Sequence, residues 1–213
     1  MVCLRHVGSL PVPASPAYIK LNARNARRGI GRGIRRTALL CAFSMLVGTS
    51  VGAREYAEGA AKAAFIYRFA GYVEWPARRS DSAVFTIAVL RDDVMAAELE
   101  HLLSGRRIND RPAHIRRIRR IDDLRDAEIL YVGSRSHEAV RRAVAKVGPR
   151  PVLIVTDEER GLDDGSVVNF MVIEQRVRFE ISLAAAERRG LRISSELLSV
   201  AARVEPGVAQ AGH

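Results

Sequence analysis

Two apolar, β-branched segments joined by a short polar loop constrain the fold of this chain most strongly. They span residues 167–173 and 177–181, and the loop is the three residues 174–176. Extended segments this close in sequence predict an antiparallel β-hairpin. The second segment alternates apolar and charged side chains, whereas the first is almost continuously apolar. The hairpin is therefore expected to lie in a sheet whose first strand is covered on both faces.

Helix-like and strand-like segments alternate upstream of this hairpin. Helices are predicted over residues 58–73, 94–103 and 136–147, and strands over 84–90, 112–121, 127–132 and 151–155. After the hairpin come a predicted short helix over 183–189, an extended piece over 191–193 and a last helix over 196–204. Such alternation favours a parallel sheet with helices on both faces. We therefore predict an α/β fold, a three-layer α/β/α sandwich with a mixed, mostly parallel sheet and a C-terminal antiparallel hairpin.

The charge of the chain is concentrated near its start. Residues 1–53 carry eight of the 34 basic residues and no acidic ones, which leaves 26 basic against 24 acidic residues in 54–213. Two arginines at 35–36, an apolar run over 37–47 and the small residue Ala53 are typical of a secretory signal. The rival interpretation, a buried helix, is disfavoured by the arginine-rich flank. We predict a basic leader plus signal peptide over 1–53 and one exported domain over 54–213.

The predicted exported domain has no recognisable catalytic or metal-binding set. Both cysteines, Cys3 and Cys41, lie in the leader, so no disulfide or thiolate chemistry is expected in the domain. His101, His114 and His137 lack metal-ligand spacing. We therefore expect no catalytic residue, no metal and no cofactor.

A run of arginines over residues 106–120 is the most basic part of the domain. A phosphate-binding patch is one interpretation. The favoured interpretation is a solvated face, because aspartates flank the run and no aromatic residues interleave it for base stacking. No nucleic-acid partner is expected for an exported protein.

Acidic residues follow the predicted strand that ends at residue 155. They are Asp157, Glu158 and Glu159, with Asp163 and Asp164 shortly after. Ligands of open α/β sheets bind beyond the carboxyl ends of strands, so a small-ligand or cation site is possible here. A polar loop that merely precedes the hairpin is the favoured interpretation.

Two blocks of sequence resemble the YfiR/HmsC-like family of periplasmic proteins. One is KAAFIYRFAGYVEWP at residues 62–76, and the other runs from 164 to 202 and contains RVRFEI and GLRISSELL. The resemblance covers about residues 56–204. It implies an α/β periplasmic repressor that binds the periplasmic sensor region of an inner-membrane diguanylate cyclase, lowers cyclic di-GMP and biofilm formation, and forms a homodimer. Some members carry disulfides, and this chain departs from them.

The expected partner-binding residues lie on the hairpin and just after it. They are Val168, Phe170, Phe179, Glu180 and Ile193. For Phe170 and Phe179, burial beneath the following helices is an equally weighted interpretation. Glu180 is expected to be exposed or paired with an arginine such as Arg178, because an unpaired buried carboxylate is unfavourable. No membrane insertion is expected after signal cleavage. The alternative function is a periplasmic small-ligand sensor that uses a pocket near Asp157 and acts on another membrane signalling protein.

Overall fold

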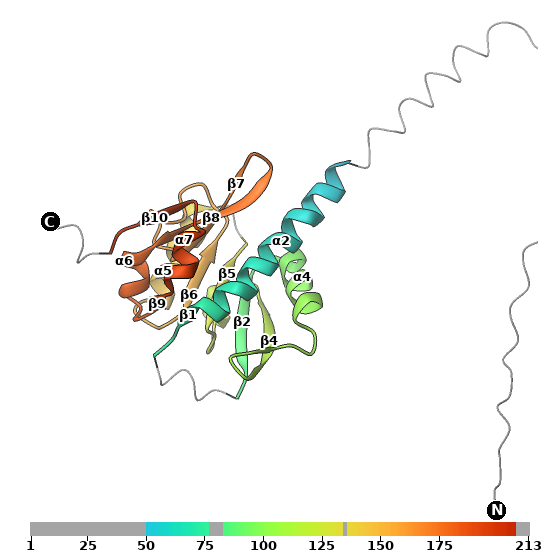
Figure 1. Cartoon of the computed structure of the whole chain (residues 1–213). Coiled ribbons are helices and arrows are strands. Elements are labelled where there is room, and N and C mark those ends of the chain that lie inside the picture. The colour runs from blue at the N-terminus through green and yellow to red at the C-terminus, as the bar shows by residue number, and fades with distance from the viewer. Residues whose placement is uncertain (1–49, 77–82, 134–135, 208–213) are drawn as a thin grey trace, which may run out of the picture. The chain divides into compact units, whose positions relative to one another are not determined.

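The structure is a computed structural model that describes residues 50–76, 83–133 and 136–207 (Figure 1). The predicted leader and signal segment falls on residues 1–53, and its first 49 residues lie outside the described ranges. Residues 50–53 begin the long helix α2 (Ser50–Tyr72), which therefore runs across the predicted cleavage position. The cleavage site stays a prediction.

The centre of the described chain is an eight-stranded mixed sheet in the order β10-β8-β7-β6-β5-β2-β4-β3. Its strands are β2 (Phe85–Leu90), β3 (Arg107–Ile108), β4 (Arg111–Ile118), β5 (Ile129–Val132), β6 (Leu153–Thr156), β7 (Val168–Ile173), β8 (Arg176–Ser182) and β10 (Arg203–Glu205). Within the described ranges, the β3–β4 and β7–β8 pairs are antiparallel and the other neighbours are parallel. The predicted mixed, mostly parallel sheet is confirmed. A separate antiparallel pair joins β1 (Val73–Glu74) to β9 (Arg192–Ile193).

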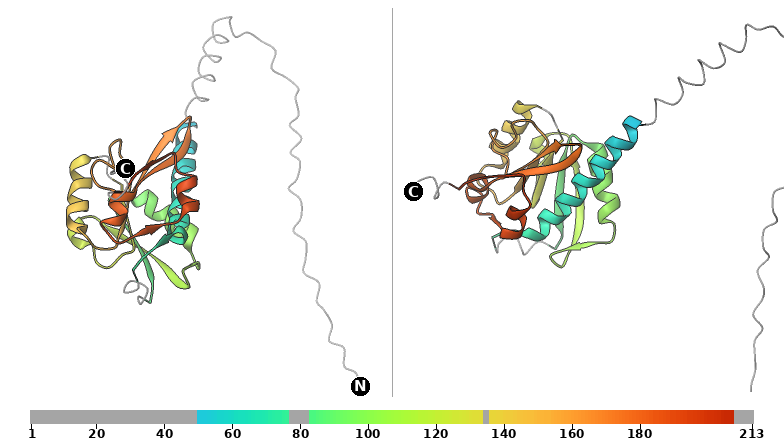
Figure 2. Two further views of the ribbon diagram at one scale, coloured as in Figure 1. Left: turned by 60° about the vertical axis from the view of Figure 1, so that its left-hand side comes forward. Right: turned by 45° about the horizontal axis from the view of Figure 1, so that its top comes forward.

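Helices cover both faces of this sheet, as Figure 2 shows with α5 on one side and α2 on the other. The helices after α2 are α4 (Asp93–Leu103), α5 (His137–Val147), α6 (Leu183–Glu187) and α7 (Ser195–Ser199), with a 3-10 turn η1 (Ile121–Asp123). Side chains of α2, α4 and α7 pack into one buried cluster, and those of α5 pack into a second. The predicted three-layer α/β/α arrangement follows from these two cores.

Strand β2 shows why the sheet needs two cores. All six of its residues are buried. Because successive side chains point to opposite faces, Ile87 and Val89 join the α2-side core, whereas Ala88 and Leu90 join the α5-side core. A central parallel strand therefore carries a continuous apolar run rather than an alternating one.

Four phenylalanines bind α2 to the hairpin. Phe170 and Phe179 are directly opposite each other in the β7–β8 register, and both are 2% exposed. Their rings lie 5.8 and 5.0 Å from the ring of Phe69, and the ring of Phe65 lies 5.3 Å from that of Phe179. Aromatic pairs at these separations stabilise packing beyond the area that they bury. This cluster fixes the hairpin against the helix.

The hairpin loop is shorter than predicted. Ile173 pairs with Arg176, so only Glu174 and Gln175 form the loop, with φ values of 49° and 62°. Two central residues with positive φ define a type I′ turn, whose twist matches that of the flanking strands. Arg176 is therefore a strand residue, because backbone pairing prevails over its polar character.

The predicted last helix over 196–204 is wrong in its second half. Helix α7 ends at Ser199, and residues 203–205 form the edge strand β10, which runs parallel to β8. The amide of Ala202 donates to the carbonyl of Phe179 at 2.8 Å, and Arg203 contacts Glu180. Pairing with an open sheet edge satisfies backbone groups that a short, solvated helix end would leave to water.

Candidate functional site

The structure places three of the five predicted partner-binding residues in the core between the hairpin and α2. Val168, Phe170 and Phe179 are at most 2% exposed. Ile193 is partly buried and pairs with Val73 in the β1–β9 sheet. Their role in binding stays a proposal. Any partner would reach the phenylalanines through the side chains that surround them.

Glu180 is also buried, at 2% exposure, so of the two expected alternatives, exposure or pairing with an arginine, the structure shows the pairing. It is paired with an arginine as expected, but the arginine is Arg203 rather than Arg178. Glu180 Oε2 accepts hydrogen bonds from Arg203 Nε at 2.8 Å and contacts Nη2 at 2.6 Å. The hydrogen bond to Glu180 is the largest cause that raises the pKa of Arg203 above its ordinary value. Arg203 belongs to a strand that the sequence did not predict, so this pair was not visible in the sequence.

Glu180 is part of a row of polar side chains across four neighbouring strands. Thr156, Asn169, Glu180 and Arg203 are successive cross-strand partners in β6, β7, β8 and β10. Thr156 Oγ1 lies 2.8 Å from Asn169 Oδ1, and Asn169 Nδ2 donates to Glu180 Oε1 at 2.9 Å. Thr156 Oγ1 also lies 3.0 Å from Ser166 Oγ. The row gives the buried polar atoms hydrogen-bond partners inside the sheet.

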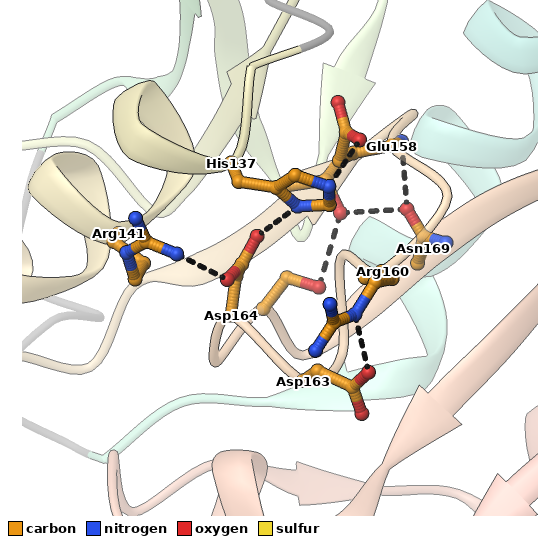
Figure 3. Close-up of polar contacts among 9 residues, drawn as sticks. His137, Arg141, Glu158, Arg160, Asp163, Asp164 and Asn169 are labelled. Atoms are coloured by element: carbon orange, nitrogen blue, oxygen red, sulfur yellow. Dashed lines mark hydrogen bonds and ion pairs between the residues drawn. The ribbon is translucent and has the colours of Figure 1, made fainter.

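A second polar cluster lies beside this row at the start of α5 (Figure 3). His137 Nδ1 is 2.7 Å from Asp164 Oδ2, and His137 Nε2 is 3.4 Å from Glu158 Oε1. Arg141 Nη1 lies 3.4 Å from the other oxygen of Asp164. Glu158 is largely buried, and its Oε2 has no hydrogen-bond partner within the described chain. The cluster joins α5 to the loop between β6 and β7.

The acidic residues predicted to form a ligand site border an open groove of about 520 Å³. Its lining residues are Asp157, Glu158, Glu159, Asn169, Phe170, Met171 and Val172. Asp157 Oδ2 accepts from Lys62 Nζ at 2.6 Å, and Lys62 is 4% exposed. Lys62 lies on α2, where it also pairs with Glu58, so its contact with Asp157 ties α2 to the end of β6. Part of the carboxylate charge of the groove is thus already compensated by the protein.

Among the residues of 50–76, 83–133 and 136–207 whose side chains are placed, no group of three or more histidine, aspartate, glutamate or cysteine residues is arranged to hold a metal ion.

Sequence reasoning missed an apolar surface that runs along α2 between the hairpin tip and α7. We call it the α2–hairpin surface and define it by Phe65, Tyr72, Val172, Val177 and Val200. Phe65 lines two grooves, one of about 350 Å³ beside Val172 and Val177, and one of about 240 Å³ beside Tyr72 and Val200. Val172 is 52% exposed and Val200 is 59% exposed. The predicted residue Phe179 lines the second groove, so the prediction and this surface meet there.

The fold and these surfaces define a three-layer α/β domain with grooves suited to a protein or small-ligand partner. The chain belongs to the YfiR/HmsC-like family, whose family model matches residues 59–202. Members of that family are periplasmic regulatory proteins. A search of curated proteins gave no match for this chain. No helix in the described ranges is long and apolar enough to cross a membrane.

Proposed function

We propose that this protein is an exported, non-enzymatic regulator that binds the periplasmic sensor region of an inner-membrane diguanylate cyclase and represses it. Repression would lower intracellular cyclic di-GMP and biofilm formation. Membership of the YfiR/HmsC-like family supports this proposal. The proposal includes a homodimer, which sedimentation of the purified protein would test.

The α2–hairpin surface is the observation that carries the partner-binding part of the proposal. The exposed aliphatic side chains Val172 and Val200 line the grooves next to Phe65. Clustered exposed apolar residues mark interaction sites in soluble proteins. The buried residues Val168, Phe170, Phe179 and Glu180 would hold the shape of this surface, with Phe179 at the floor of one groove.

Repression needs a difference in affinity between two states of the cyclase. A bound regulator shifts an equilibrium only by the ratio of its affinities for the two states. The proposed contact would therefore be tighter with the inactive sensor region than with the active one. This difference is measurable as tighter binding to a cyclase variant locked in its inactive state.

The first experiment measures intracellular cyclic di-GMP in a strain that lacks the gene, complemented with the full chain or with its variants. Wild-type protein should lower cyclic di-GMP, and the double variant Val172→Asp with Val200→Asp should not. The matched control is Val94→Asp, because Val94 is 65% exposed but lies on α4. Repression that survives the double change, in a folded and exported protein, would exclude the α2–hairpin surface. Cyclic di-GMP that does not change on deletion would exclude cyclase repression itself.

The groove beside Asp157 supports a second candidate function, a periplasmic small-ligand sensor that acts on another membrane protein. The observation in its favour is the buried Glu158 oxygen without a hydrogen-bond partner in the described chain, next to a groove of about 520 Å³. Thermal-shift screening with small metabolites distinguishes the two functions. A shift that Glu158→Gln abolishes, together with no binding to a cyclase sensor region, would favour the sensor.

A further inference from the structure

A basic groove lies on the opposite side of the sheet from the α2–hairpin surface. It has a volume of about 550 Å³ and lies between α5 and the residues that follow β2 and β4. Its charged lining residues are Arg91, Arg119, Arg120, Arg142, Lys146 and Asp122. Five cationic side chains against one carboxylate give the groove a strong local excess of positive charge. The volume falls within the range of small-molecule sites.

The arginines of the run over 106–120 have different surroundings in the structure. Arg117 on β4 forms a bidentate ion pair with Glu100, with N–O distances of 3.0 and 2.6 Å. Arg119 and Arg120 follow the end of β4 and line the groove instead. Arg119 and Arg120 are exposed to solvent like Arg117, as the solvated-face interpretation expects, and they also line the groove.

The charges inside the groove are only partly compensated. Asp122 lies 3.0 Å from Lys146 and 3.3 Å from Arg120, and the hydrogen bonds with Lys146 and then Arg120 lower the pKa of its carboxyl. Arg142 pairs with Glu138 on its own helix. Within the described ranges, the guanidinium of Arg119 makes no hydrogen bond or ion pair. The groove thus retains a cation that is available to an anionic ligand.

Arg91 lines the groove and has an unusual backbone conformation. Its φ is 60°, a left-handed value that is unfavourable for a residue other than glycine. Its amide donates to the carbonyl of Ile118 at 3.0 Å, and its Nε donates to the carbonyl of Arg119 at 3.2 Å. The side chain is thereby fixed beside Arg119. Glycine would adopt this backbone conformation with less strain, so the presence of arginine here indicates a role for its side chain.

The position of the groove agrees with the topology. The chain runs from β2 outward to β4 and then returns to β5 on the other side of β2. Open α/β sheets bind ligands beyond the carboxyl ends of strands near such a reversal. Arg91 follows β2 directly, so the basic side chains lie at this end of the sheet.

We propose that the groove lined by Arg91, Arg119 and Arg142 binds a small phosphate-bearing ligand. Guanidinium groups match phosphate oxygens in charge and in two-pronged hydrogen-bond geometry, and several together suit a ligand with more than one negative charge. The phosphate could belong to a soluble compound or to a lipid headgroup. This site is independent of the cyclase-binding proposal, because it lies on the α5 side of the sheet.

Calorimetric titration of the intact protein with pyrophosphate at low salt tests the proposal. Wild-type protein should bind, and the double variant Arg91→Gly with Arg119→Gln should bind at least about tenfold more weakly, as expected for lost charged hydrogen bonds. The Gly substitution relieves the left-handed strain, so this variant should not be lost through unfolding. The control is Arg178→Gln, an exposed arginine on β8, which should keep wild-type affinity.

Two results would overturn the proposal. One is that wild-type protein binds neither pyrophosphate nor phosphatidylglycerol vesicles, and the other is that Arg178→Gln loses as much affinity as the double variant. Cosedimentation with phosphatidylglycerol vesicles, against phosphatidylcholine vesicles, distinguishes the sources. Binding to anionic vesicles that depends on Arg91 and Arg119 and is not displaced by pyrophosphate would identify a lipid headgroup. Displacement by pyrophosphate would identify a soluble ligand. Repression of the cyclase can be lost or retained whichever ligand binds the basic groove, so cyclase repression and phosphate binding can be tested separately.

Discussion

Asn169 donates a hydrogen bond from Nδ2 to Oε1 of Glu180 at 2.9 Å, across the antiparallel pair of β7 and β8. Both side chains are at most 2% exposed. The other carboxylate oxygen of Glu180 accepts from Arg203 on β10. The amide therefore aligns a buried carboxylate so that it can hold the arginine of an edge strand. This relationship joins the centre of the sheet to its C-terminal edge.

Replacement of Glu180 by Ala should destabilise the protein by about 3 kcal/mol, because it leaves the amide of Asn169 and the guanidinium of Arg203 without their shared acceptor. Chemical denaturation measures the free energy of unfolding. Glu180→Gln is the milder comparison, since it keeps one acceptor oxygen and the side-chain volume. A loss below about 1 kcal/mol for Glu180→Ala would mean that the pair contributes little.

Replacement of Gly161 by Ala should destabilise the protein by about 2 kcal/mol, as overpacking does in a filled core. A Cβ atom there would lie 2.3 Å from Thr156 Oγ1 and 2.4 Å from Asn169 Oδ1. The control is Gly71→Ala in α2, where a Cβ atom meets nothing within 4 Å. That change should stabilise the helix by about 0.5 kcal/mol. Thermal melts of both variants would test the contrast, and equal shifts would contradict it.

The pair of Glu100 and Arg117 should make stability depend on pH. The hydrogen bond from Arg117 is the largest cause that lowers the pKa of Glu100 from 4.5. A carboxyl with a lowered pKa in the folded state stabilises the protein fully above its unfolded value and loses this effect as the pH falls through the folded value. Glu100→Gln should therefore lower the melting temperature at pH 7 and converge with wild type in acid. High salt should shrink the difference, because the pair is partly exposed. A difference that persists in acid would contradict this account.

Loss of Asp157 should destabilise the protein more than loss of its partner Lys62. Asp157→Ala leaves a 4% exposed ammonium with only Glu58, at an expected loss of about 2 kcal/mol. Lys62→Met keeps the packed aliphatic stem, and the two carboxylates left behind retain access to water, so a loss below about 1 kcal/mol is expected. Urea titrations of both variants would measure the two losses in the free energy of unfolding. A larger loss for Lys62→Met than for Asp157→Ala would contradict this prediction.

Much of the fold could be predicted because local patterns agree with the tertiary structure. Helices over 94–103 and 136–147 match α4 and α5 to within a residue at each end. Apolar runs predicted β2, β5 and β6, whereas β4 was predicted from a basic strand-like run over 112–121 and ends earlier, at Ile118. The turn of Asn109 and Asp110 between β3 and β4 carries a signal that went unused, since both residues have positive φ and both residue types tolerate it.

The candidate sites were harder to predict because they depend on contacts between distant residues. Alternation along β8 correctly separates Phe179 from Glu180, but it cannot show that both faces are covered. The groove with Arg91 and Arg119 forms because the C-terminal ends of β2 and β4 lie side by side, where Leu90 pairs with Ile118. In the sequence, 27 residues lie between these two positions. The α2–hairpin surface likewise combines three segments.

The sequence by itself determined the alternation of helices and strands, the tight hairpin and the family resemblance, because periodicity and residue type act locally. Only the tertiary structure decided that residues 203–205 pair with β8, that Glu180 is buried, and which arginines converge on one groove. The physical reason is that burial, ion pairing and strand pairing between distant segments are set by the assembled sheet, whose free energy outweighs weak local preferences.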